Sequence, residues 1–320
     1  MYSRLAYVYW FSAGKTACAW AHLREMSLAE RYPPTPELAQ AYSEHAPVMT
    51  MVPWNERGIA YARRSLEIRT DLGDVWGQGQ SANFLGVVLY SASRYRESIH
   101  ECHKAIRLLE RTGDRWEQHT ATWIMAFNHY RLGELDIALR MAQSLQVEAS
   151  EIGDRTAAGI VLSAWARAGL GRVPEELIAA ELGRDNGDAH TAVEVRLADA
   201  VRLLLAGELE PAIDRLEEAQ GIVREAGLRQ EFVATIRPWL ATARRMQCES
   251  ADAHAPRSLR VKRLRRARGA ARRAARLSRS YRNNRPHALR ELALVLALRG
   301  RTRRAGRLLQ RSLAVALQHG

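Results

Sequence analysis

Residues 73–113 read GDVWGQGQSANFLGVVLYSASRYRESIHECHKAIRLLERTG, and this stretch decides the fold of the 320-residue chain. A Gly-Asp pair begins it at Gly73, and the same pair recurs at Gly113 and again at Gly153. Two successive intervals of forty residues predict an internal repeat with that period.

Each repeat is predicted to be a pair of helices. Residues 76–90 are expected to form one helix, 91–94 a turn and 95–111 a second helix, because apolar side chains in 95–111 recur at three- and four-residue spacing. A hairpin of this size buries too little apolar surface to fold alone, so it must stack on copies of itself. The sequence therefore predicts a helical solenoid.

Small side chains at matching positions of the second helices support the repeat. Ser98, Cys102 and Ala105 define the pattern within the unit. The equivalent triplets are Ala138, Ala142 and Leu145; Gly58, Ala62 and Ser65; Ala19, Leu23 and Met26; Ala212, Leu216 and Ala219; and Ala305, Leu309 and Ser312. The pattern resembles the tetratricopeptide repeat, in which two helices cross closely at such positions. The resemblance implies an all-α fold, a right-handed α-solenoid of tetratricopeptide-like helical hairpins with a period of about 40 residues.

Three segments are predicted along the chain. Residues 1–247 are expected to form the tetratricopeptide-like array, 248–258 an inserted loop, and 259–320 a continuation of the array with a strongly basic helix. The loop is predicted because residues 249–256 are polar and separate two helical segments. Near the other end, Thr35 followed by Pro36 predicts a capped helix start.

A second resemblance concerns the N-terminal repeats. The run AERYPPTPELAQAYSEHAP, residues 29–47, resembles the repeat regions of very large bacterial signalling ATPases and sensor kinases. The likeness extends over about residues 5–245, and none of that family's catalytic motifs is present. It implies a sensor or relay segment of a bacterial signal-transduction regulator, acting as a non-catalytic protein-protein interaction scaffold.

The C-terminal part of the chain is strongly basic. Residues 251–320 contain 20 basic and 2 acidic side chains, and 257–285 contain 13 basic side chains and no acid. One basic helix is predicted over 257–285, with a docking surface for an acidic protein or a polyanion at Arg263, Arg266, Arg273 and Arg276. Polyanion or nucleic-acid binding through this helix is the alternative function. Another interpretation is a solvated arginine-rich helix in a GC-rich genome, since only three of the 48 basic residues are lysine.

A groove for a protein or peptide partner is the other predicted site. In tetratricopeptide arrays the first helices line the concave surface, and several aromatic residues fall in first helices here. The predicted groove residues are Asn83, Tyr90, Trp123, Phe127, Tyr130 and Arg167. Packing between helices is the alternative role for the aromatic side chains.

No catalytic, cofactor or metal site is predicted. His100 and His103 lie one turn apart, but Cys102 points to the packed seam and no third ligand has suitable spacing. The sequence contains no recognisable catalytic arrangement, so we expect a protein that is not an enzyme. Widely separated cysteines and the lack of a long apolar run predict a cytoplasmic protein without membrane contact. Apolar side chains on the terminal helices predict self-association.

Overall fold

The computed structural model describes residues 5, 15–184, 188–250 and 256–319. These residues form helices and turns and include no strand, so the predicted all-α solenoid of helical hairpins is confirmed. The chain divides into two compact units, Met1–Ile124 and Met125–Gly320, with the division inside one helix. Each unit is described by itself.

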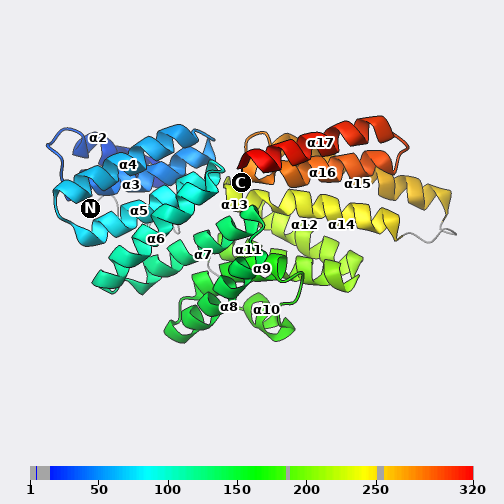
Figure 1. Cartoon of the computed structure of the whole chain (residues 1–320), viewed down its shortest axis with the longest axis horizontal. Helices are drawn as coiled ribbons and strands as arrows, with labels where there is room; N and C mark the ends of the chain where they lie inside the picture. The colour runs from blue at the N-terminus through cyan, green and yellow to red at the C-terminus, as the bar shows by residue number, and fades with distance from the viewer. Residues whose placement is uncertain (1–4, 6–14, 185–187, 251–255, 320) are drawn as a thin grey trace. The chain divides into compact units, whose positions relative to one another are not determined.

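Unit 1 is a stack of antiparallel helices joined by short turns (Figure 1). Its helices are α2 (Lys15–Ala29), α3 (Pro36–Met51), α4 (Asn55–Asp71), α5 (Val75–Ser91), α6 (Tyr95–Thr112) and the first part of α7 (Arg115–Leu132). The predicted helices at 76–90 and 95–111 correspond to α5 and α6 within one residue at each end. The cap before α3 is also confirmed, since the hydroxyl of Thr35 accepts a hydrogen bond from the Leu38 amide at 3.2 Å.

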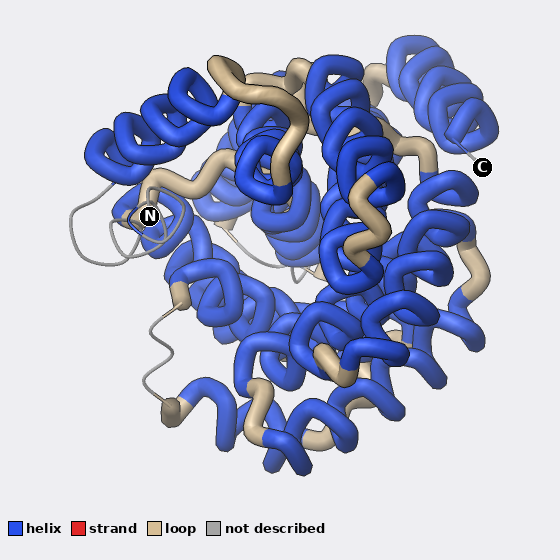
Figure 2. The backbone as a smooth tube through the Cα atoms, turned by 90° about the vertical axis from the view of Figure 1, so that its left-hand side faces the viewer, coloured by secondary structure: helices blue, strands red, loops and turns tan. Residues whose placement is uncertain are grey.

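Unit 2 is also built of helices joined by turns and loops (Figure 1). Figure 2 shows the described backbone of the chain as helices and loops, with no strand drawn. Unit 2 contains the remainder of α7 and then α8 (Leu135–Ile152), α9 (Arg155–Ala168), α10 (Glu175–Leu182), α11 (Ala189–Ala206), α12 (Leu209–Glu225), α13 (Glu231–Ala234), α14 (Ile236–Glu249), α15 (Arg257–Leu277), the 3-10 turn η1 (Arg282–Asn284), α16 (Arg285–Ala297) and α17 (Thr302–His319). Residues 251–255, the middle of the predicted inserted loop, lie outside the described residues.

The repeated Gly-Asp pair is the junction between hairpins. Gly113 ends α6 in the left-handed region with φ of +75°, a conformation that costs a glycine little. The carboxylate of Asp114 then accepts a hydrogen bond from the Glu117 amide at 3.1 Å and so caps α7. Asp74 and Asp154 cap α5 and α9 in the same way. Every forty residues, therefore, a glycine ends one helix and the aspartate after it caps the start of the next.

The small residues of the second helices form the buried seam. Ser98, Cys102 and Ala105 are all fully buried on α6. The Ser98 hydroxyl donates a hydrogen bond to the Gly86 carbonyl at 2.7 Å, which ties α6 to α5 where the helices approach closely. Such an approach needs side chains no larger than these, because backbone atoms occupy the space that a longer side chain would fill.

Two of the predicted triplets do not lie wholly in the seam. Ala19 and Leu23 are exposed on α2, and Leu309 is exposed on α17. On α2 the side facing α3 instead carries His22, Glu25 and other buried side chains. The prediction was wrong there because it transferred the register of the central repeats to helices whose packed side is rotated.

The basic helix is shorter than predicted. Helix α15 ends at Leu277 rather than at residue 285. The chain turns because Asn284 enters the core, where its amide donates to Glu231 Oε1 at 2.9 Å, and Arg131 donates to the Asn283 carbonyl at 3.0 Å. Pro286 then occupies the first turn of α16, where its missing amide hydrogen costs no helical hydrogen bond.

Candidate anion-binding site

The arginines of α15 lie on two different faces of the helix. One face is turned toward α12 and α14, and the other toward α16 and α17. Each face borders a cavity, and the two cavities differ in charge. This difference decides which arginines are available to a ligand.

The first cavity contains both signs of charge. It has a volume of about 620 Å³ and is lined by α12 carboxylates as well as by arginines. Its charged lining residues are Glu210, Asp214, Glu217, Arg244, Arg265, Arg266 and Arg273. Arg244 contacts Glu217 at 2.5 Å, and Arg263 lies 3.8 Å from Glu210. Acids of the same chain therefore neutralise much of this face.

The second cavity is basic throughout. It has a volume of about 740 Å³ and lies where α15, α16 and α17 meet. Seven arginines line it, together with three leucines, and no carboxylate is among the described lining residues. The arginines are Arg268, Arg272, Arg299, Arg301, Arg303, Arg304 and Arg307, and we call this set the arginine cavity.

None of these seven guanidinium groups forms an ion pair with a carboxylate in the part of the chain that the structure describes. Burial, and then the positive charges of Arg272 and Arg299, lower the pKa of Arg268. The Nε atom of Arg268 is also buried without a hydrogen-bond partner. These groups are held near one another although like charges repel.

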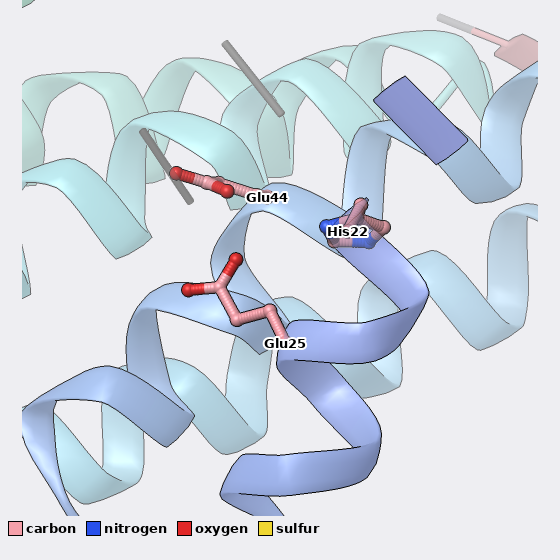
Figure 3. A group of neighbouring side chains, drawn as sticks. All are labelled: His22, Glu25 and Glu44. Atoms are coloured by element: carbon pink, nitrogen blue, oxygen red, sulfur yellow. The ribbon is translucent and has the colours of Figure 1, made fainter. Parts of the chain in front are cut away.

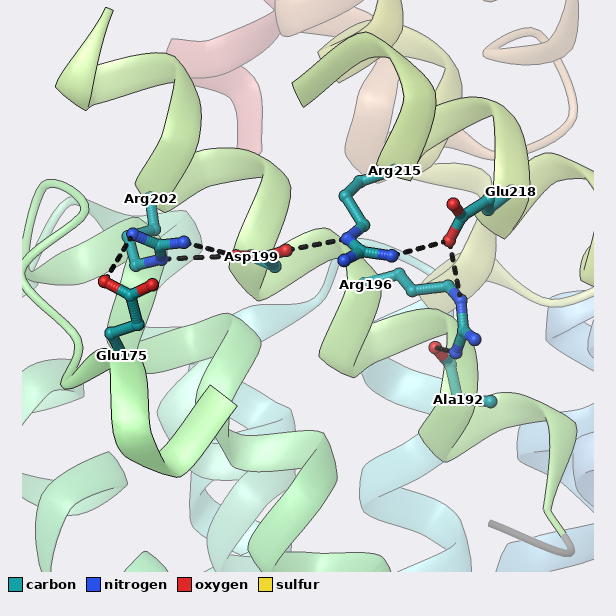
Figure 4. A network of polar contacts seen from close by, with 7 residues as sticks. All are labelled: Glu175, Ala192, Arg196, Asp199, Arg202, Arg215 and Glu218. Carbon is teal, nitrogen blue, oxygen red and sulfur yellow. Dashed lines mark hydrogen bonds and ion pairs between the residues drawn. The ribbon is translucent and has the colours of Figure 1, made fainter. Parts of the chain in front are cut away.

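Other arginines of unit 2 are paired, which makes the contrast clear (Figure 4). Asp199 accepts from Arg202 at 3.0 Å and from Arg215 at 2.8 Å, and Arg215 also binds Glu218 at 3.0 Å. This network joins α11 to α12 and leaves no net positive site. The arginine cavity lacks such partners, so an anion would replace water rather than displace a carboxylate.

The chemistry of the arginine cavity suits phosphate. A guanidinium group donates two parallel hydrogen bonds to a phosphate or carboxylate, and remains charged at all physiological pH values. A cavity of this volume is in the range that holds a small ligand or a section of a polymer. Among its described lining residues there are leucines but no aromatic side chain, so it offers charge and shape rather than base stacking.

The predicted docking residues lie mainly on the neutralised face. Arg266 and Arg273 line the first cavity, and Arg263 faces Glu210. Arg276 is exposed and borders neither cavity. Sequence inspection missed five members of the arginine cavity because they follow 257–285. The run RGRTRRAGR at 299–307 was the available signal.

The predicted groove residues are mostly buried. Asn83, Tyr90 and Trp123 belong to unit 1, and Phe127, Tyr130 and Arg167 to unit 2. All except Tyr130 are buried, so Tyr130 alone among these six offers a partly exposed side chain. Partner binding by this set stays a prediction.

The buried members have internal partners. The amide of Asn83 donates to Glu117 Oε2 at 2.7 Å. In unit 2, the Arg167 guanidinium lies 4.9 Å from the ring centres of both Phe127 and Tyr130. Its Nε donates to the Ser163 carbonyl at 2.7 Å. These contacts match the alternative of packing between helices.

The His-Cys-His segment of α6 is divided between the core and the surface. Cys102 is buried in the seam while His100 and His103 are exposed, and burial raises the pKa of the Cys102 thiol to about 12.

On α17, the apolar side chains Leu309, Leu313 and Leu317 are exposed at four-residue spacing. Among the described helices, none has an apolar stretch long enough to cross a membrane.

Comparison with known proteins gives a fold but no family. No family model and no curated protein matches the sequence. A solved structure of a monomeric IFIT1 mutant with Gppp-AAAA is similar over 98% of this chain and 68% of the IFIT1 chain, with a TM-score of 0.54 and 16% identity. A second IFIT1 mutant, with m7Gppp-AAAA, covers the same shares with a TM-score of 0.51 and 15% identity. At these identities the likeness establishes a tetratricopeptide-like helical repeat fold.

Proposed function

We propose that this chain is a non-catalytic scaffold that binds single-stranded RNA through the phosphates, with the arginine cavity of α15, α16 and α17 as the binding site. The single observation that carries the proposal is the set of seven guanidinium groups around one cavity with no carboxylate among its described lining residues. Arginines without acidic partners are costly to hold together unless a polyanion neutralises them.

The choice of RNA rests on two further points. The similar IFIT1 structures carry Gppp-AAAA and m7Gppp-AAAA, which are phosphate-rich RNA ligands on the same fold. A flexible single strand can also follow a concave cavity more closely than a folded acidic protein can. Backbone recognition of this kind depends strongly on salt and only weakly on sequence.

The sequence supports phosphate contacts better than base recognition. Near the C-terminal end of α15, Asn283 and Asn284 are buried, and Asn284 is engaged with Glu231. Tyr281 is half-buried. Few side chains therefore remain for reading base edges.

Two other functions stay predictions. An acidic protein partner would have to compete with Glu210 and Glu217, which already face the other side of α15. The role as a sensor or relay in a bacterial signal-transduction regulator rests on the sequence resemblance alone. This role does not account for an arginine cavity without carboxylates among its described lining residues.

The test is binding of a fluorescein-labelled ten-nucleotide RNA by fluorescence polarisation over a range of salt concentrations. In the cavity variant, Arg268, Arg272, Arg301 and Arg304 are replaced with glutamine. We expect binding to weaken about 30-fold or more, because four phosphate-binding groups are removed. The slope of log affinity against log salt should become shallower by about 0.7 for each phosphate that the variant no longer binds.

A matched variant carries the same charge change on other residues of α15. It replaces Arg263, Arg266, Arg273 and Arg276 with glutamine and should retain most of the affinity. If this variant loses binding while the cavity variant keeps it, the cavity is not the site. Stronger binding to a polyglutamate peptide than to RNA would instead favour an acidic protein partner.

A further inference from the structure

Unit 1 contains a cluster of potential metal ligands that plays no part in the proposed RNA site. His22 and Glu25 lie three residues apart on α2, so their side chains share one face of that helix. Glu44 and His45 are on α3, which packs against α2. Figure 3 shows His22, Glu25 and Glu44 side by side at this helix pair.

The geometry of the cluster suits a single ion. One ligand atom from each of His22, Glu25 and Glu44 lies within 4.8 Å of the ligand atoms of the other two. Bonds from Zn²⁺ to nitrogen and carboxylate oxygen are about 2.0–2.2 Å long, so two ligands of one ion lie about 3–4 Å apart. Small side-chain rotations would bring the three atoms to that spacing.

One carboxylate oxygen of the cluster lacks a partner. Glu25 is only 9% exposed, and its Oε2 atom is buried without a hydrogen-bond partner. Burial, and then the negative charge of Glu44, raise the pKa of Glu25 to about 7. The buried Oε2 atom of Glu25, which has no hydrogen-bond partner, is therefore a suitable ligand atom for a cation.

The histidines provide a neutral ligand rather than a counter-ion. His22 Nε2 and His45 Nδ1 share a hydrogen bond of 2.8 Å, and the rings are stacked with centres 5.0 Å apart. Because this bond uses His22 Nε2, the other ring nitrogen of His22, Nδ1, is the one that can bind a metal ion. Metal-binding histidines commonly form such a bond through their other nitrogen, which fixes the ring orientation. Burial lowers the pKa of both rings, so both are neutral at pH 7.

We propose that His22, Glu25 and Glu44 form a Zn²⁺ site that joins α2 to α3, with His45 orienting His22 through their hydrogen bond. One imidazole and two carboxylates favour Zn²⁺ over Mg²⁺ and Ca²⁺, which prefer oxygen ligands alone. Three protein ligands leave one tetrahedral position for water. The ion would also give the buried Oε2 atom of Glu25 a partner.

The experiment is isothermal titration of the whole chain with ZnCl2, with MgCl2 as a second titrant. We expect one saturable Zn²⁺ site and no Mg²⁺ site. Glu25→Gln and Glu44→Gln should each weaken Zn²⁺ binding at least about 10-fold, and His45→Ala should weaken it less. The matched control Glu37→Gln removes an exposed acid from α3 and should bind like the unchanged chain.

Glu25→Gln is also informative about folding. The substitution keeps the side-chain shape and removes a buried charge, so the metal-free variant should be at least as stable as the parent in thermal unfolding. Loss of Zn²⁺ binding by a stable variant would therefore support the site. The RNA affinity of this variant should be unchanged, which separates this proposal from the RNA-binding proposal.

Three results would overturn the site. The first is the absence of saturable Zn²⁺ binding. The second is equal binding by the unchanged chain, Glu25→Gln and Glu44→Gln. The third is a loss of binding in Cys18→Ser while the glutamate variants still bind, because the metal would then sit on the thiol of Cys18 on α2, which is close enough to Glu44 for the carboxylate to raise its pKa.

Discussion

The backbone at Gly86 of α5 lies directly against the thiol of Cys102 on α6. A Cβ atom added to Gly86 would lie 2.5 Å from Cys102 Sγ, which is closer than two such atoms can approach. The central hairpin therefore depends on two small residues that are 16 positions apart in the sequence. Gly86 cannot gain a side chain unless Cys102 becomes smaller.

Gly86→Ala should destabilise the chain. Alanine is the better helix former, but the clash with Cys102 outweighs this gain, and we expect a net loss of about 1–3 kcal/mol. Chemical denaturation followed by circular dichroism measures the change. Adding Cys102→Ala should restore part of the stability, because it removes the sulfur that clashes. If the two changes are additive, the contact does not limit the packing.

The arginine cavity should reduce stability when no anion is present. Arg268→Gln and Arg272→Gln each remove a positive charge from a group of like charges, so the melting temperature in low salt should rise. Arg202→Gln breaks the network around Asp199 and should lower stability by about 1 kcal/mol. Differential scanning calorimetry in low and high salt measures the melting temperature of each variant relative to the parent. The change in melting temperature should be positive for the two cavity variants and negative for Arg202→Gln. Changes of the same sign would contradict the contrast between arginines with and without carboxylate partners.

Glu231 should make stability depend on pH. Burial raises the pKa of Glu231 to about 8 from an ordinary value of 4.5, so the folded chain retains the proton over a range where the unfolded chain has lost it. The free energy of unfolding from this group is therefore greatest below pH 4.5 and falls as the pH rises to 8.

Glu231→Gln should remove this dependence. The variant is expected to be more stable than the parent at pH 8 by on the order of 2–4 kcal/mol, and nearly equal to it at pH 5. Urea unfolding at both pH values tests this. Equal destabilisation at both would show that the carboxyl group acts only through its hydrogen bonds with Asn284.

Arg167 should be a structural residue of unit 2. Its side chain is buried beside Glu194, at 4.0 Å, and between two aromatic rings. Arg167→Met leaves Glu194 as a buried acid with one cation fewer and should cost about 3–5 kcal/mol. Adding Glu194→Gln should recover much of this loss in urea unfolding. A fully stable Arg167→Met variant with weaker partner binding would favour the predicted groove instead.

The candidate site shows where prediction from sequence ended. The excess of arginine after residue 256 was visible, and so was the helix that begins near it. The sequence did not show that carboxylates neutralise one face of that helix and leave the arginines of the other face without acidic partners. That difference depends on the rotation of α15 between α12 and α17. A rotation of one residue, about 100°, exchanges the partners of every arginine on the helix.

The metal-ligand cluster shows the same limit. His22 and Glu25 are three residues apart, a spacing common on any helix. Only the packing of α3 adds Glu44 and His45, which come about 20 residues later. Sequence inspection considered His100 and His103, whose spacing looked similar, but those two side chains are exposed.

The sequence by itself determined the hairpins, since their signals are local. A glycine of positive φ, a capping Asp one residue later and small residues at helical spacing each act within a few positions of the chain. Tertiary structure decided which side chains meet. The arginine cavity is formed by three successive helices, and the buried partners of Arg167 come from α7, α9 and α11. The rotation of each helix is fixed by packing over many residues together. No short segment of the chain contains that information.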